Sequence, residues 1–269
     1  MTQLSIYQVD AFASRVFGGN PAAVMPLETW LPEETLQALA MENNLAETAF
    51  FVAEQQGSEA DFHIRWFTPR AEVPLCGHAT LASAWVLFHR LGWQGEHLRF
   101  RSKSGTLGVR RLEKDRLELD FPALAIRPVA VPDILARALP EVSSQVFEVP
   151  HDTNLMVVLD SEDAVRRAKP DMTLLKTLDN QGVIITAPGD QCDFVSRYFA
   201  PALGIDEDPV TGSIHSALVP YWASRLDRTR FRARQLSARG GELECELRGD
   251  RVSIAGPAIL YMEGRVILA

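Results

Sequence analysis

Hydrophobic and polar residues alternate along several short stretches of the chain, and alternation of this kind predicts β-strands. Residues 4–12 and 62–68 alternate over most of their length. Residues 98–121 continue the pattern through turns at Ser104-Gly105 and Lys114-Asp115, which predicts a β-meander. Further strands are expected at residues 22–25, 147–159, 182–187, 193–199 and 235–268. The pattern therefore predicts β-sheet in both halves of the chain.

A second kind of pattern predicts helices. Residues 74–91 are expected to form a turn and a helix, and the helix is apolar on nearly every side, so it is expected to be surrounded by strands. An earlier helix opens at Pro32, with acidic residues in its first turn, and ends near Asn44. A proline removes a backbone donor, so Pro220 is expected to kink or end the helix that follows Asp208. Two more helices are expected at 161–169 and 172–178.

The two halves of the chain contain matching residues at a nearly constant offset. Gly77 and Gly212 are 135 residues apart. The stretch Arg65-Trp66-Phe67-Thr68-Pro69 matches Arg197-Tyr198-Phe199-Ala200-Pro201 at an offset of 132. Residues 122–132 contain three prolines and are the best candidate for a linker. Because the offset is close to half of the 269 residues, a duplicated domain is predicted.

Composition narrows the classes of function. The chain is 46% hydrophobic and 23% charged, which is enough apolar material for a core in each of two domains. A net charge of −8 argues against a nucleic-acid partner. No apolar run reaches membrane length, and residues 1–10 lack the features of a signal peptide. Cys76, Cys192 and Cys245 are odd in number and outside any metal-ligand spacing, so a cytoplasmic protein without a metal is expected.

The matching glycines lie in two turns with candidate chemistry. Residues 75–82 and 208–217 each lead through a glycine into small and apolar residues, which predicts two helix N-termini. The first N–H groups of a helix are unpaired and the macrodipole is positive there, so each start is expected to bind an anionic group. Glu47 begins a different apolar stretch, where burial would raise its pKa and its reactivity as a proton carrier. A surface glutamate on an edge or cap is the alternative.

Six motifs in the chain resemble those of the phenazine-biosynthesis PhzF family. They are Gly19-Asn20-Pro21-Ala22-Ala23-Val24, Glu47-Thr48-Ala49-Phe50, Arg65-Trp66-Phe67-Thr68-Pro69, Cys76-Gly77-His78-Ala79-Thr80, Phe199-Ala200-Pro201 and Asp208-Pro209-Val210-Thr211-Gly212-Ser213. The resemblance implies an α/β (α+β) protein with the duplicated, pseudo-two-fold fold of diaminopimelate epimerase, each half a β-barrel-like sheet around a central helix. The halves are expected at 1–122 and 123–262, and the strand 263–269 can return to the first half.

The resemblance also implies a cofactor-independent isomerase, often a homodimer, with its active site in the cleft between the halves. By resemblance, Glu47 removes a proton from carbon and returns it elsewhere, with His78, Asp208 and Ser213 around the substrate. A carbon acid needs a desolvated carboxylate base, and the anion formed needs fixed donors. Those donors are expected to be backbone N–H groups at Gly77–His78 and Gly212–Ser213. Asp208 can equally be a turn and N-cap residue, and His78 a structural donor.

Cys76 leaves a further alternative open. The related epimerases use two facing cysteines, and Cys76 resembles the first, but residues 208–210 contain no thiol, so a two-thiol mechanism is disfavoured. A helix N-terminus would lower the pKa of Cys76, so catalysis by this single thiol is one alternative. The other is that Cys76 is a small buried side chain that only fills space in the core. The expected function is an isomerase of a small, carboxylate-bearing, anionic metabolite. The alternatives are a Cys76-based epimerase and a catalytically silent ligand-binding or protein-interaction module.

Overall fold

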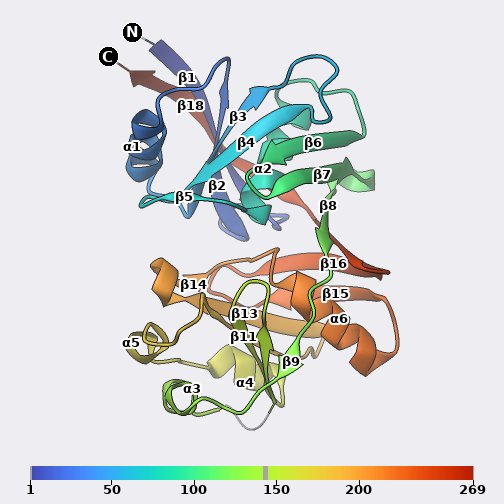
Figure 1. Cartoon of the computed structure of the whole chain (residues 1–269). Coiled ribbons are helices and arrows are strands. Elements are labelled where there is room, and N and C mark those ends of the chain that lie inside the picture. The colour runs from blue at the N-terminus through green and yellow to red at the C-terminus, as the bar shows by residue number, and fades with distance from the viewer. Residues whose placement is uncertain (1, 142–144, 269) are drawn as a thin grey trace. The chain divides into compact units, whose positions relative to one another are not determined.

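The structure is a computed structural model that describes residues 2–141 and 145–268 (Figure 1). Contacts between Cα atoms divide the chain into unit 1, residues 1–120 and 255–269, and unit 2, residues 121–254. The last strand, β18, pairs with β1 from Ala258 opposite Ala11 to the end. Residues 258–262, which the sequence analysis assigned to the second half, therefore belong to unit 1, because they are hydrogen-bonded to its first strand.

Unit 1 is a sheet with two helices. Its elements are β1 (Thr2–Ala11), β2 (Asn20–Leu27), α1 (Glu33–Asn43), β3 (Glu47–Ala53), β4 (Phe62–Phe67), β5 (Glu72–Val73), α2 (Gly77–His89), β6 (His97–Ser102), β7 (Gly105–Arg111), the 3-10 turn η1 (Glu113–Asp115), β8 (Leu117–Pro122) and β18 (Ala258–Leu268). β1 lies antiparallel to both β18 and β2. β2 is parallel to β3, β3 antiparallel to β4, and β4 parallel to β6. The meander predicted for residues 98–121 is β6, β7 and β8.

Unit 2 repeats this plan. Its elements are β9 (Arg127–Pro128), α3 (Asp133–Ala138), β10 (Val146–Val149), β11 (Asn154–Val158), α4 (Glu162–Arg167), α5 (Met172–Leu175), β12 (Val183–Pro188), β13 (Phe194–Ala200), η2 (Pro201–Leu203), β14 (Ile205–Asp208), α6 (His215–Leu226), β15 (Arg230–Gln235), β16 (Gly241–Arg248) and β17 (Arg251–Gly256). β10 is antiparallel to β9 and β11, β11 is parallel to β12, β12 is antiparallel to β13, and β13 is parallel to β15. The order of parallel and antiparallel pairs is that of unit 1.

One side-chain arrangement occurs in both units and shows the duplication in detail. The guanidinium of Arg65 in β4 lies 5.0 Å from the ring centre of Phe67 and pairs with Glu72 in β5 at 2.8 Å. The guanidinium of Arg197 in β13 lies 4.9 Å from the ring centre of Phe199 and pairs with a carboxylate of β14 at 2.7 Å. The arginine and phenylalanine of the repeated sequence stretch therefore occupy equivalent strands, which confirms the duplicated fold.

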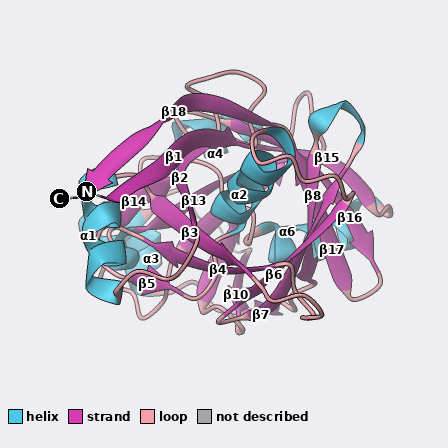
Figure 2. Ribbon diagram, turned by 90° about the horizontal axis from the view of Figure 1, so that it is seen from above, coloured by secondary structure: helices cyan, strands magenta, loops and turns pink. Residues whose placement is uncertain are grey.

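Helix α2 is the buried centre of unit 1. Every residue from Gly77 to Phe88 is buried, and the helix contacts β1, β2, β3 and β7 (Figure 2). The prediction of a helix surrounded by strands within residues 74–91 is confirmed, and the helix itself runs from Gly77 to His89. In unit 2, α6 packs on the sheet in a similar way, because Trp222 stacks on Phe194 of β13 and donates its indole N–H to Thr186 of β12. No helix of the described residues is long and apolar enough to cross a membrane.

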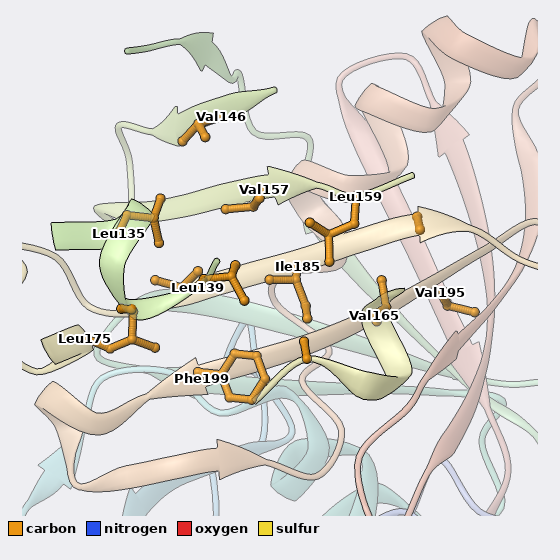
Figure 3. Close-up of a cluster of buried hydrophobic side chains, with 14 residues drawn as sticks. Leu135, Leu139, Val146, Val157, Leu159, Val165, Leu175, Ile185, Val195 and Phe199 are labelled. Carbon is orange, nitrogen blue, oxygen red and sulfur yellow. The ribbon is translucent and has the colours of Figure 1, made fainter. Parts of the chain in front are cut away.

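The shorter helices cover the other face of each sheet. In unit 2, side chains of α3, α4 and α5 meet valine and isoleucine side chains of β10, β11 and β12 in one buried cluster, which Figure 3 shows with Leu135, Val165 and Ile185 among its labelled members. In unit 1, Leu36 and Leu39 of α1 pack against Phe50 and Phe67. Burial of each such side chain contributes about 1.5–3 kcal/mol to folding, so each sheet is held between a central helix and an outer helical layer.

Pro220 does not end the second central helix, although an end was one of the two outcomes expected from the sequence. α6 runs from His215 to Leu226 with Pro220 inside it. A proline leaves the carbonyl four residues earlier without its helical donor. That carbonyl belongs to Ser216, and it accepts a hydrogen bond of 2.8 Å from the backbone N–H of Leu124. The donor therefore comes from the linker stretch. The helix continues past Pro220 because the Ser216 carbonyl still has a hydrogen-bond partner.

Candidate active site

Glu47 is a buried carboxylate at the first position of β3. The strand forms because residues 49–51 are apolar and buried between β2 and β4, and its parallel pairing places Glu47 opposite Ala22. The residue is only 9% exposed. Charged residues are rarely this buried unless they are paired or functional. The sequence alternative of a surface glutamate is therefore wrong.

The partner of Glu47 is His78, in the first turn of α2. His78 Nε2 lies 3.2 Å from Glu47 Oε2, and both side chains are almost completely buried. Within the part of the chain that the structure describes, neither atom has a hydrogen-bond partner of good geometry. Buried polar atoms are nearly always hydrogen-bonded in folded proteins. An acid and a base that lie close together without a good hydrogen bond are therefore typical of an active site. In such a site, the substrate supplies the missing hydrogen bonds.

The other ring nitrogen of His78 faces two side chains. Asn20 Nδ2 lies 3.2 Å from His78 Nδ1, and Cys76 Sγ lies 3.5 Å from the same nitrogen. Asn20 is the first residue of β2 and is fully buried, and Cys76 is the N-cap of α2. Asn20 and Glu47 come from the neighbouring strands β2 and β3, and α2, which carries His78, packs against both strands. The imidazole is therefore held on both edges.

Burial and charge act differently on the two titratable neighbours. Burial by itself lowers the pKa of His78, but the adjacent Cys76 sulfur and Glu47 carboxylate stabilise the imidazolium and raise that pKa well above its ordinary value. Burial, with a smaller contribution from Glu47, raises the pKa of Cys76 to about 11. The sequence expectation that a helix N-terminus lowers the pKa of Cys76 is wrong, because desolvation of the thiolate outweighs the helix dipole. At neutral pH, Cys76 is a thiol.

The same three side chains offer atoms that could ligate a metal. One ligand atom each from Glu47, Cys76 and His78 lie within 4.8 Å of one another. Zinc holds sulfur at about 2.3 Å and nitrogen at about 2.0 Å, so an ion would have to lie close to all three atoms at once. Cys76 and Glu47 also face opposite edges of the ring. A cation would have to break one of these two contacts, so the geometry fits proton transfer better than metal binding.

The predicted residues of the second half lie in unit 2. Asp208 ends β14 and is buried, and its carboxylate accepts a hydrogen bond from the hydroxyl of Thr211. The side chain of Gln235 donates to the Asp208 carbonyl at 2.8 Å and accepts from the Thr211 N–H at 2.9 Å. These bonds fix the turn of residues 208–211, which is the turn role that the sequence analysis gave as an alternative for Asp208.

Gly212 and Ser213 do not begin a regular α-helix, in contrast to Gly77. Gly77 is the first residue of α2, whereas α6 begins at His215. Residues 212–217 are instead joined by bonds between residues three apart, from His215 N–H to the Gly212 carbonyl and from the next residue to the Ser213 carbonyl. The two predicted helix starts therefore differ, because the second is preceded by one tighter turn.

Sequence reasoning missed Asn20 as a member of the site. The residue was part of a quoted motif but was given no role. Its signal in the sequence is a polar side chain between a glycine pair and an apolar strand. Gly19, just before it, has a φ of +62°, and a Cβ there would lie 2.1 Å from the Ala11 carbonyl oxygen. The contact with His78 spans 58 positions, so no local pattern reveals it.

Known proteins resemble this chain over nearly its full length. The family model of phenazine biosynthesis-like (PhzC-PhzF) proteins matches residues 9–264. A protein of Pseudomonas aeruginosa that is named an uncharacterized isomerase is 52% identical over 266 residues, which cover 99% of this chain and 100% of the relative. A crystal structure of a PhzF-family phenazine biosynthesis protein from Enterococcus faecalis matches with a TM-score of 0.94 at 46% identity, covering 99% of this chain and 100% of that one.

A more distant match extends the fold beyond the family. A hydroxyproline epimerase from Agrobacterium vitis matches with a TM-score of 0.62 at 11% identity, covering 98% of this chain and 92% of the epimerase. At this identity the match shows a shared fold and nothing about the residues that act. The chain therefore belongs to the phenazine biosynthesis-like PhzC-PhzF family, has the epimerase-like fold predicted from its motifs, and is an isomerase.

Proposed function

We propose that this isomerase moves a proton between carbon atoms of a small, carboxylate-bearing metabolite by general acid–base catalysis, without a cofactor. Glu47 is the base that removes and returns the proton, and His78 donates a hydrogen bond from its Nε2 towards Glu47 or the substrate. The observation that carries the proposal is the buried pair of Glu47 Oε2 and His78 Nε2, 3.2 Å apart and without good hydrogen bonds in the described structure. This separation is within hydrogen-bond reach, so an N–H at Nε2 can orient the carboxylate that takes the proton.

The anionic substrate is proposed from the start of α2. Gly77 and His78 are the first residues of this helix, and their N–H groups have no carbonyl partner within it. Such groups, together with the positive end of the dipole, stabilise a carboxylate or an enolate. The roles of Asp208, Gly212 and Ser213 in substrate binding stay predictions. A homodimer and a cytoplasmic location stay predictions.

The structure makes the Cys76-based epimerase less favourable. A nucleophilic or basic cysteine needs the thiolate, and burial raises the pKa of Cys76 to about 11. We therefore assign the thiol a packing role beside His78, in contact with Nδ1.

A screen in D₂O tests the proposal without knowledge of the substrate. A metabolite extract is incubated with the protein in D₂O, and mass spectrometry identifies compounds that gain deuterium at carbon. At least one carboxylate-bearing compound is expected to gain it, and Cys76→Ser is expected to keep most of the exchange. Loss of exchange in Cys76→Ser alone would favour the epimerase. A compound that binds, as shown by a shift in unfolding temperature, but never exchanges with any variant would favour the silent binding module.

A further inference from the structure

We propose that Asn20 is a positioning residue that places the ring proton of neutral His78 on Nε2, where it faces Glu47. The inference rests on the proposed function, in which the N–H of His78 Nε2 orients the carboxylate of Glu47. Its geometric basis is the contact of 3.2 Å between Asn20 Nδ2 and His78 Nδ1. An amide nitrogen only donates hydrogen bonds, so the ring nitrogen that faces it must accept. A neutral imidazole with an accepting Nδ1 carries its proton on Nε2.

The backbone around Asn20 leaves the side chain little freedom to move away. Asn20 pairs with Ala11 across the β1–β2 ladder. The chain reaches it through Gly19, in a conformation and a space that only glycine accepts. The preceding loop is closed by a hydrogen bond of 3.0 Å from the Phe17 N–H to the carboxylate of Asp10. A rigid turn therefore fixes the position of the Asn20 side-chain amide beside His78.

An asparagine suits this position because it can serve both protonation states of the ring. Turned by half a rotation, its carbonyl oxygen accepts a bond from the imidazolium Nδ1–H, and no charge is added to the buried site. An ionised aspartate can only accept hydrogen bonds. It would therefore hold the proton of the neutral ring on Nδ1 and leave Nε2 unprotonated. The titratable groups in contact with the ring are Glu47 and Cys76.

Cys76 is the competing explanation, and it can be separated from Asn20. A thiol is a weak donor, and its sulfur lies 3.5 Å from the same Nδ1. If the thiol alone positioned the proton, removal of Cys76 would free Nδ1 and substitution of Asn20 would not. The two variants therefore give opposite results for the two explanations.

The second unit offers a matched control. Asn154 begins β11 as Asn20 begins β2, and it is also buried. Its side-chain oxygen accepts a hydrogen bond of 3.0 Å from the hydroxyl of Tyr198, so this contact is with a tyrosine rather than a histidine. Asn154→Asp makes the same chemical change in an equivalent strand and should leave His78 unaffected.

The test is nitrogen NMR of the full chain labelled with ¹⁵N-histidine, because the two ring nitrogens have different shifts in each tautomer. His78 is assigned by the loss of its signals in His78→Gln, since the chain has six histidines. At the alkaline end of the titration, wild type, Cys76→Ala and Asn154→Asp are expected to carry the proton on Nε2. Asn20→Asp is expected to move it to Nδ1 and to raise the pKa of His78.

Two results would overturn the proposal: a wild-type ring with its proton on Nδ1, or a proton that stays on Nε2 in Asn20→Asp. A proton that moves in Cys76→Ala would also overturn it, in favour of the thiol. If Asn20→Asp does not fold, the wild-type and Cys76→Ala spectra still decide. The spectra need no substrate, so they can support the positioning role even if no compound exchanges. Where exchange is found, Asn20→Asp should slow it by about 10- to 100-fold, by analogy with the loss of partners that orient metal-ligating histidines.

Discussion

Acidification should destabilise unit 2 through His215, and the size of this effect follows from the structure. His215 is fully buried in the first turn of α6, and its Nδ1 lies 2.9 Å from the Thr211 carbonyl, to which it donates. Burial lowers the pKa of His215 to about 4 from the ordinary 6.5. The unfolded chain therefore binds a proton near pH 6.5, while the folded chain resists it until about pH 4. Stability is lost as the pH falls through this window.

The difference between these two pKa values sets the magnitude. At about 1.36 kcal/mol per pH unit, the complete loss is about 3 kcal/mol, and at pH 5 it is about 2 kcal/mol. His215→Asn keeps a donor near the Thr211 carbonyl but cannot titrate. The variant is expected to be less stable than wild type at pH 7.5, because it packs less well, and to lose about 2 kcal/mol less than wild type between pH 7.5 and pH 5.

Urea unfolding at the two pH values measures this difference. Tryptophan emission is a suitable probe, because Trp222 is the one tryptophan in the sequence of unit 2 and stacks on Phe194 beside His215. Carboxylates that titrate in the same range are present in both proteins, so their contribution cancels in the comparison. If wild type and His215→Asn lose the same free energy within about 0.5 kcal/mol, the buried neutral histidine is not the cause and the reasoning is refuted.

Two further predictions concern unit 1. Gly19→Ala should lower the free energy of unfolding by at least about 2 kcal/mol, because its Cβ would meet the Ala11 carbonyl; Gly57→Ala, which has a positive φ but open space, should cost only about 1 kcal/mol in the same urea experiment. Equal costs for the two variants would argue against the close approach. Cys76 should not react with a thiol reagent at pH 8 in the folded protein and should react after unfolding, since burial raises its pKa to about 11. Rapid labelling of Cys76 in the folded protein would contradict its assignment as a neutral buried thiol.

The duplicated fold could be predicted because the two halves of the amino-acid sequence contain matching residues. The arginine and phenylalanine of residues 65–67 recur at 197–199, and the two stretches form equivalent strands, β4 and β13. The all-round apolar pattern of residues 77–88 was equally informative, since a helix with no polar face has to be buried on every side. These features depend on spacing and residue type within one segment, and the sequence contains both.

Features that depend on distant partners could not be predicted. Pro220 suggested a helix kink or end because a proline removes the helical donor to the Ser216 carbonyl. The N–H of Leu124 replaces that donor, but it lies almost a hundred positions earlier in the sequence. The pKa of Cys76 was expected to fall because the helix N-terminus is visible in the sequence, whereas the burial that reverses the effect is not. The contact between Asn20 and His78 likewise exists only after β2 and α2 have packed together.

The central claim is that Glu47 is the base, and the rate of deuterium gain at carbon tests it most directly. With a substrate found in D₂O, wild type is compared with Glu47→Gln, which keeps the shape of the side chain and removes its basicity. Glu118→Gln is the control, because Glu118 is another buried carboxylate, in an ion pair with Arg110 at 2.8 Å. The account predicts that Glu47→Gln slows the gain of deuterium by about 10²- to 10⁴-fold while Glu118→Gln changes it little. Deuterium gain at an unchanged rate in folded Glu47→Gln would contradict it.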